Sequence, residues 1–428
     1  MTKIRMTNIR WLMMGLIILL VLINYVDRVA LAFAVGPITT EYNLSPAQWG
    51  AITSAFSIGY LVFAFVSGPI VDRLGVKKTL TGAVAIWSVA ASLMACVGSF
   101  MGFFVARILL GLGEGPGFPS ATKAARTWLP RTERGRVLSL IGGAGVSASI
   151  LFGGPICSQL ILAFGWRGMF VVLGGAGIVW LVLWLCFFHE KPKTHTSISP
   201  AEVAHICADD ETTLAQSSSA SPVQVIVPFW RNLTLWMIGL GFFSWGYVFW
   251  GLMYWLPAFL EKTYQLKLGA VGLFSILPWS AGIVGALVGG TVMDQLAKRG
   301  KRMRPTYVFM GVMLFCAGLC MIPVLLFHSL MISLTFISLG LGFGFVTGGF
   351  WWIGCIEASP HRPGFAAGFM DACFALSGII APFVMGEAVE LTGSFMAGFS
   401  LMLAVAIIGA LALILGTRET TYIVPANG

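Results

Sequence analysis

Asp27, Arg28, Arg107 and Glu114 are ionisable residues placed inside long apolar stretches of the sequence. At membrane depth an ionisable side chain costs at least ~2.5 kcal/mol, and it usually faces a protein interior or a water-filled cavity. Arg107 and Glu114 are seven positions apart, so on a helix they share a face and lie about 10 Å from each other. We therefore expect these charges to form a site that holds a charged solute and exchanges protons.

The two carboxylates are the groups best placed to exchange protons. The five His residues, at 189, 195, 205, 328 and 361, lie outside the deep parts of the apolar stretches, so a histidine relay is not expected. Asp27 and Glu114 in unlike surroundings would load and release protons at different stages. Two alternatives stay open: Asp27 and Arg107 could form a static ion pair between helices, and Glu114 could be a permanently protonated packing residue.

The composition requires a lipid bilayer around these groups. Apolar residues make up 57% of the chain, charged residues 10%, and the mean hydropathy is +0.88, whereas soluble domains have about 25% charged residues. The 52 Gly suit close helix packing in lipid. The 8 Cys show no zinc-ligand spacing, so we expect neither a metal nor another cofactor.

Apolar runs of about 20 residues recur along the chain, which is the length a spanning helix requires. The sequence therefore predicts an all-α membrane protein with twelve transmembrane helices. Their expected ranges are 11–35, 48–68, 77–98, 101–125, 137–163, 167–189, 230–258, 269–293, 306–327, 330–356, 364–389 and 393–416.

The Lys and Arg residues predict the orientation, because cytoplasmic loops are enriched in them. Every second loop is basic, while the opposite loops hold only Arg167, Lys262 and Lys267. This alternation places both termini in the cytoplasm and accounts for the net charge of +9. Nucleic acid is therefore not an expected partner, and we expect a multi-pass protein of the cell membrane, in a bacterium the inner membrane.

A polar stretch divides the expected helices into six and six. Residues 190–228 read as a cytoplasmic linker between two six-helix bundles, at 1–189 and 229–428. Gly68 and Asp72 after the second span are repeated by Gly290 and Asp294 after the eighth. Internal duplication of this kind is typical of secondary transporters with a central binding site.

The loop at 68–78, Gly-Pro-Ile-Val-Asp-Arg-Leu-Gly-Val-Lys-Lys, is the most specific motif in the chain. Gly68 would let backbones approach, Asp72 could cap a helix, and cations can bond helix C-termini. The loop closely resembles the cytoplasmic signature between helices two and three of the major facilitator superfamily, which implies that family's fold. The resemblance also implies that Asp72 and Arg73, with Gly68, Gly75 and Lys77, latch the bundles in the outward-facing state. The alternative is an ordinary basic cytoplasmic loop.

Two further motifs narrow the resemblance. The stretch Asn-Tyr-Val-Asp-Arg at 24–28 and the pattern Arg-x-x-x-Gly-x-Gly-Glu-Gly-x-x-x-Pro at 107–119 are similar to those of the anion:cation symporter family. That family includes bacterial galactonate, hexuronate and glucarate transporters. It implies proton binding at Asp27 and Glu114 and anion binding at the matching arginines.

Five more positions are expected to line the substrate site. Asn24 shares a helix face with the carboxylate three positions on, Tyr25 belongs to the same motif, and Tyr60 lies at matching depth in the second span. Trp351 is either a core residue or a platform on which a sugar stacks. Asp371 stands where the family often has a substrate-contacting Asn. That departure leaves open a smaller acid, a cationic or zwitterionic compound, or an anion bound with an extra proton; Asp371 could also simply face a polar neighbour.

Together these patterns favour proton-coupled symport of an organic anion, a sugar acid or small carboxylate, by alternating access in a monomer. A uniporter or anion exchanger remains an alternative. A drug/proton antiporter is disfavoured because Gly154-Pro155 lacks the glycine pair expected after it. The chain shows no nucleophile elbow or phosphate-binding loop, so an enzyme is not expected.

Overall fold

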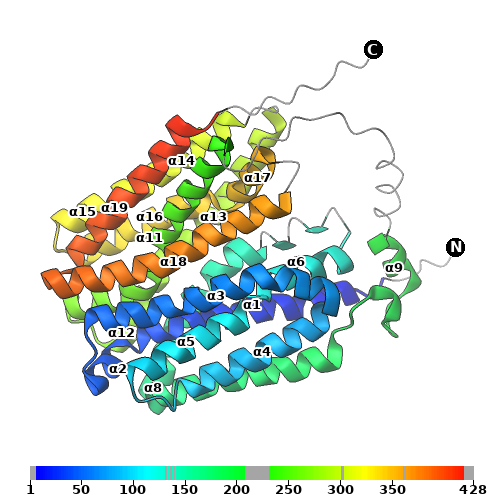
Figure 1. Cartoon of the computed structure of the whole chain (residues 1–428), viewed down its shortest axis with the longest axis horizontal. Coiled ribbons are helices and arrows are strands. Elements are labelled where there is room, and N and C mark those ends of the chain that lie inside the picture. The colour runs from blue at the N-terminus through cyan, green and yellow to red at the C-terminus, as the bar shows by residue number, and fades with distance from the viewer. Residues whose placement is uncertain are drawn as a thin grey trace.

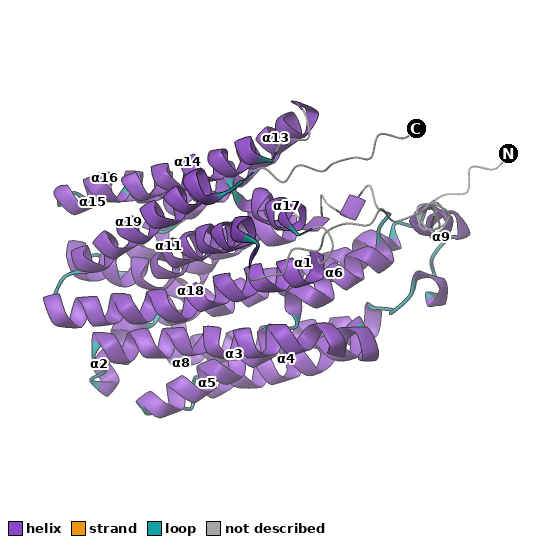
Figure 2. Ribbon diagram, turned by 45° about the horizontal axis from the view of Figure 1, so that its top comes forward, coloured by secondary structure: helices purple, strands orange, loops and turns teal. Residues whose placement is uncertain are grey.

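The computed structural model describes residues 6–130, 133–134, 137–138, 140–207, 231–299, 303–359 and 363–418. Within these ranges every regular element is a helix, as Figure 2 shows. Part of the expected linker, from residue 208 to residue 228, and several of the basic loop residues lie outside the described ranges.

The helices of the first half pack mainly with one another, and so do those of the second half (Figure 1). The first group comprises α1 (Ile9–Phe33), α2 (Val35–Tyr42), α3 (Pro46–Leu74), α4 (Val76–Leu93), α5 (Phe100–Glu114), α6 (Gly117–Trp128) and α8 (Gly145–Phe187). The short helix α9 (Pro200–Cys207) follows it. The second group comprises α11 (Leu233–Tyr264), α12 (Leu268–Phe274), α13 (Ile276–Arg299), α14 (Arg304–Leu319), α15 (Met321–Leu326), α16 (Leu330–Val346), α17 (Gly348–Ala358), α18 (Pro363–Thr392) and α19 (Phe395–Leu411). In Figure 1 the molecule is elongated, with α2 at one end and α9 at the other, and we name these the α2 end and the α9 end.

Eight helices in the described ranges are long and apolar enough to cross a bilayer, and a bent pair within α3 raises the number to nine. The count is lower than twelve partly because α8 joins two expected spans. Gly165 breaks α8 with φ 70 and ψ 170, and a 43-residue helix would otherwise reach about 65 Å, twice the hydrocarbon core. Similarly, the expected span 101–125 is interrupted between α5 and α6, where Pro116 precedes the new helix. The number twelve stays a prediction.

Glycines set the position of α5 against its neighbours. A Cβ added at Gly111 would collide with the backbone carbonyl of Phe56 in α3, and one at Gly59 would collide with that of Ile108. A Cβ at Gly113 would lie 2.7 Å from the backbone nitrogen of Trp87 in α4. Close helix contact of this kind needs small residues. It places the arginine and the carboxylate of α5 between α1, α3 and α4.

The largest contact between the two groups joins α3 to α18. At the α2 end, positions Gly50 and Gly386 allow close approach, with their added Cβ atoms 2.7 Å from Pro382 O and 2.5 Å from Pro46 O. Glu390 of α18 accepts hydrogen bonds from Ser45 Oγ at 2.6 Å and from Ala47 N at 2.9 Å. The carboxylate thereby caps the first turn of α3, and the α2 end of the interface is closed.

Candidate functional site

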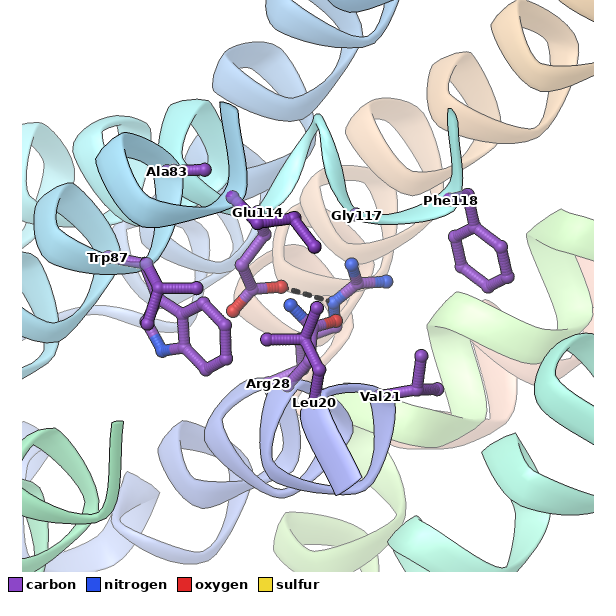
Figure 3. A pocket seen from close by; sticks show the side chains of 12 residues that line it. Leu20, Val21, Arg28, Ala83, Trp87, Glu114, Gly117 and Phe118 are labelled. Carbon is purple, nitrogen blue, oxygen red and sulfur yellow. Dashed lines mark hydrogen bonds and ion pairs between the residues drawn. The ribbon is translucent and has the colours of Figure 1, made fainter. Parts of the chain in front are cut away.

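A buried ion pair between α1 and α5 forms the centre of the site. Arg28 donates from Nε to Glu114 Oε2 at 2.6 Å, and the two side chains are 2% and 0% exposed. Figure 3 shows the two groups meeting, with Trp87 on one side. The second carboxylate oxygen of Glu114, Oε1, is buried and has no hydrogen-bond partner. Glu114 Oε1 can therefore bind a proton or accept a hydrogen bond from another donor.

Aromatic rings surround the Arg28 guanidinium. Its Cζ lies 4.4 Å from the ring centroid of Tyr25, 4.8 Å from Phe56 and 5.0 Å from Tyr60. A fourth ring, that of Trp250 in α11, lies at 5.9 Å. Rings at this range attract a cation through their quadrupole, by ~2 kcal/mol or more where water is excluded. Arg28 is thus held as a cation at the meeting point of both helix groups.

Arg107 is the second buried cation of the site. It donates from Nη2 to the hydroxyl of Tyr254 at 2.8 Å, and its Cζ lies 4.9 Å from the ring of Phe56. Its Nε has no hydrogen-bond partner, although the residue is only 1% exposed. Because Arg28 also contacts Phe56, the two guanidinium groups flank one ring. An anion that bound both would bridge α1 and α5.

Asp27 lies beside the pair but has a different partner. Its Oδ2 accepts a hydrogen bond from Trp87 Nε1 of α4, and its Oδ1 is buried without a partner. The described residues contain an Arg28–Glu114 ion pair and no Asp27–Arg107 ion pair. The alternative of a static Asp27–Arg107 ion pair is therefore not what the structure contains.

The cavity beside the ion pair is small in this conformation. It measures about 10 Å³, room for about one water molecule. Asn24, Arg28, Trp87 and Glu114 contribute to its wall, and Phe118 closes one side (Figure 3). An organic anion can enter only if the surrounding helices separate. All of its lining residues belong to the first helix group, so this cavity is not the space between the two groups.

The remaining expected substrate residues lie around this centre. Asp371 in α18 is half-buried, and its charge acts on the hydroxyls of Tyr25 and Tyr60. Trp351 in α17 is 1% exposed and packs against Phe242 with centroids 5.1 Å apart. Its indole Nε1 has no hydrogen-bond partner. The structure thus places Trp351 in the core, with an unused donor.

The loop between α3 and α4 contacts its own helix group in this structure, and the expected latch of the outward-facing state stays a prediction. A Cβ at Gly68 would meet nothing within 4 Å, so no backbone approaches it here. Asp72 lies 3.3 Å from Lys123 of α6, and Arg73 is exposed. Gly75 has φ 83, a conformation that requires glycine.

The helix cap at this loop comes from a residue that the sequence did not single out. Glu190 accepts from the backbone nitrogens of Val76 and Lys77, both at 2.8 Å. The ammonium of Lys77 donates to Leu185 O at 3.0 Å. Glu190 follows the end of α8, far from 76–77 in sequence, so only the fold reveals the contact. In this conformation Lys77 and Glu190 join α4 to the end of α8, within the first helix group.

Trp87, Trp250 and Tyr254 are site residues that sequence reasoning missed. Trp250 and Tyr254 lie in α11, which is rich in aromatic residues, whereas Trp87 is the one aromatic residue of α4. The only available signal is that Trp250 and Tyr254 are four positions apart, hence on one face of α11. Their rings stack with centroids 5.8 Å apart.

Comparisons with known proteins agree with this architecture. The Major Facilitator Superfamily profile matches residues 17–382. The chain is 31% identical to the "Probable sulfoacetate transporter SauU" of Cupriavidus necator, over 94% of this chain and 93% of that one. It is 30% identical to the "Hexuronate transporter" of Bacillus subtilis, over 92% and 91%. It is 28% identical to the "Probable L-galactonate transporter" of Escherichia coli, over 97% and 91%.

Among solved structures, a bacterial homologue of the human lysosomal transporter Spinster superposes with a TM-score of 0.71 at 16% identity, over 96% of each chain. That likeness shows the fold. The chain belongs to the Major Facilitator Superfamily. It is therefore a multi-pass membrane transporter and not an enzyme.

Proposed function

We propose that this chain is a proton-coupled symporter that carries an organic anion across a membrane by alternating access. The observation that carries the proposal is the buried Arg28–Glu114 ion pair. Asp27 and Arg107 lie beside it, each with an unpartnered polar atom. Relatives named for sulfoacetate, hexuronate and galactonate transport support an organic anion as the solute.

Coupling follows from competition for one guanidinium. The Glu114 carboxylate and the carboxylate of a solute both need Arg28, because a charge without a partner in a dry interior is costly. When the solute takes Arg28, Glu114 loses its partner and avoids the cost by binding a proton. When the proton leaves, Glu114 returns to Arg28 and displaces the solute. Anion and proton therefore bind and leave together.

The other expected site residues have supporting roles in this scheme. Arg107 supplies a second contact to the anion through its unpartnered Nε. Asp27 offers a second proton site at its unpartnered Oδ1. Tyr25 and Tyr60 hold the Arg28 guanidinium in place. The cavity-lining amide of Asn24 can bond a polar group of the solute.

The proposed architecture is that of twelve helices in two bundles, at 1–189 and 229–428, joined by a cytoplasmic linker at 190–228. The protein would lie in a bacterial inner membrane with both termini on the cytoplasmic side. It would work as a monomer. Asp72, Arg73 and Lys77 would form the cytoplasmic latch of the outward-facing state, with Gly68 and Gly75 allowing the loop to close.

Uptake into proteoliposomes tests the proposal. We would supply D-galacturonate, D-glucarate, sulfoacetate and benzoate in separate assays and impose an inward proton gradient. We expect at least one anion to accumulate above its outside concentration in the wild type. In Glu114→Gln we expect no accumulation, because the amide binds no proton. Glu41→Gln, which removes an exposed carboxylate at the α2 end, is the matched control and should accumulate normally.

Two results would contradict proton coupling. One is wild-type uptake that is the same with and without the gradient, which would favour a uniporter or an exchanger. The other is gradient-driven accumulation that persists in both Glu114→Gln and Asp27→Asn.

A further inference from the structure

Resting on the proposed function, we infer that the transported anion is an aromatic monocarboxylate. Its carboxylate binds Arg28 and Arg107, and its ring packs against the aromatic side chains of α11 and α18, chiefly Trp250 and Phe374. The inference depends on the second half of the chain, which supplies the wall opposite the arginines.

That wall is a continuous row of rings. Trp250 lies 5.5 Å from Phe374, centroid to centroid, and Phe374 stacks on Phe242 at 4.9 Å with 23° between the planes. Phe242 in turn lies 5.1 Å from Trp351. The row begins beside Arg28, because the Trp250 ring is 5.9 Å from its Cζ. Trp250, Phe242 and Trp351 are buried and Phe374 is half-buried, so a flat apolar body would contact this row only once the two helix groups separate.

The second half lacks the groups that recognise a polyhydroxylated solute. Residues 233–416 contain no Asn, and their two Gln residues, at 265 and 295, lie near the ends of helices. Several hydroxyls of these helices bond their own backbone instead. Such bonds are Ser244 to Leu240 O, Ser338 to Leu334 O, Thr347 to Gly344 O and Ser377 to Phe374 O. A sugar acid would leave its hydroxyl groups unpaired against this wall, at about 1–3 kcal/mol for each buried group.

The same half also disfavours a second negative charge on the solute. No Lys or Arg occurs at 233–261, 268–297, 305–361 or 363–416, so these segments offer no cation to a second carboxylate. Among the carboxyl groups of these segments, that of Asp371 is half-buried and lies near Tyr25 and Tyr60. Two carboxylates in one dry site repel each other. The solute should therefore have its single charge at the end that contacts the arginines.

Trp351 adds a further preference at the far end of the row. Its Nε1 is a buried donor without a partner, and such a group is satisfied when a polar acceptor reaches it. An acceptor on the ring, such as a hydroxyl group, suits that position.

Affinities of the purified full-length protein test the inference. We would measure binding of benzoate, phenylacetate, D-galacturonate and D-glucarate by ligand-induced thermal shift and by calorimetry. We expect the two aromatic acids to bind about tenfold tighter than the two sugar acids. Trp250→Leu should weaken benzoate binding by about tenfold, since ring stacking contributes ~0.5–1.5 kcal/mol beyond burial. Trp279→Leu, which removes a buried ring that packs on Phe249 and Phe345, is the control and should retain benzoate affinity.

Asp371→Asn gives a second, independent readout. Terephthalate has a carboxylate at each end, so it should bind the wild type at least tenfold more weakly than benzoate does. In Asp371→Asn this difference should shrink several-fold, because the repulsive charge is gone. Benzoate should gain less affinity than terephthalate in the same variant, because its carboxylate lies at the arginines.

The outcomes separate this inference from the proposed function. If D-galacturonate or D-glucarate bound more tightly than the aromatic acids and was taken up with the proton gradient, the aromatic substrate would be contradicted. The proposal of a proton-coupled symporter would not be. Equal weakening of benzoate and D-galacturonate in Trp250→Leu would also overturn the aromatic substrate, because the ring would then be structural. Anion binding that is unchanged in Arg28→Ala would contradict both proposals.

Discussion

Asp27 is a buried carboxyl group whose hydrogen-bond donor is an indole. It is 2% exposed and next to Arg28 in sequence, yet it accepts a hydrogen bond from the indole of Trp87. A hydrogen bond to a charged group contributes about 1.5–3 kcal/mol, against 0.5–1.5 kcal/mol for a neutral pair. The indole therefore decides how easily this carboxyl group keeps its charge.

Trp87→Phe should destabilise the protein by about 1–3 kcal/mol, because the buried carboxyl group of Asp27 loses its donor. The matched control is Trp180→Phe, which removes a bond of 2.9 Å from an equally buried indole to a neutral acceptor, Leu16 O. In detergent, the midpoint temperature of thermal unfolding should be lower for Trp87→Phe than for Trp180→Phe. Equal loss in the two variants would contradict a charged Asp27.

At the scale of elements, close packing at glycines positions α5. A Cβ at Gly113 would meet backbone atoms of Trp87, which cannot move aside as a flexible side chain can. The next residue along α5 is Glu114, so any displacement of the helix also moves the ion pair. Packing and chemistry are thus linked through one helix contact.

Gly113→Ala should therefore cost about 1–3 kcal/mol of stability and weaken anion binding. Gly82→Ala in α4 is the control, since a Cβ there meets nothing within 4 Å. An alanine in an open helical position should stabilise by ~0.5–1 kcal/mol. Thermal unfolding and anion affinity measure both effects. Normal anion affinity in a folded Gly113→Ala protein would contradict the link between packing and site.

A separate contact ties α9 to the start of α1. Glu202 accepts hydrogen bonds from Thr7 Oγ1 at 2.6 Å and from the backbone nitrogens of Ile9 and Arg10 at 3.1 Å. Burial acts to raise the pKa of Glu202, but these bonds outweigh it and hold the pKa below its ordinary value. A carboxyl group with a lowered pKa stabilises the folded contact at neutral pH, and this stabilisation is lost as the pH falls through the lowered pKa.

Glu202→Gln should loosen α9 at neutral pH, because the amide replaces a charged acceptor at a helix N-terminus. Hydrogen exchange of residues 200–207 should become faster in the variant. In the wild type the same increase should begin only as the pH falls below the ordinary glutamate pKa of about 4.3, and it should be complete once the pH has passed the lowered pKa of Glu202. Exchange in α9 that is unaffected by the substitution would contradict this role.

The positions of the key charges were predictable, but their partners were not. Asp27, Arg28, Arg107 and Glu114 stand out in sequence because ionisable residues are rare in long apolar runs. The expected depths of Glu114 and Arg28 in the membrane differ, so the sequence did not indicate a contact between them. The long arginine side chain nevertheless reaches the carboxylate. The aromatic partners in α11 gave no signal beyond the spacing of Trp250 and Tyr254, because that helix is rich in apolar residues on every face and 23 of its 32 residues are buried.

For the whole molecule, the structure is closed between the helix groups at the α2 end. Glu390 and Ser45 join the helix groups at the α2 end, and the cavity beside Arg28 admits about one water. Membership of the superfamily was predictable from the loop at 68–78. The points at which individual helices begin and end were less predictable, because the break at Gly165 and the interruption between α5 and α6 depend on local backbone geometry.

Proton uptake on anion binding tests the central claim most directly. The purified protein in weakly buffered solution near pH 7 would be mixed with a saturating anion, and the pH change followed with an indicator. We predict that the wild type takes up protons as the anion displaces Glu114 from Arg28, and that the Asp27→Asn, Glu114→Gln double variant takes up none. Saturating anion binding by the wild type without proton uptake would contradict the account.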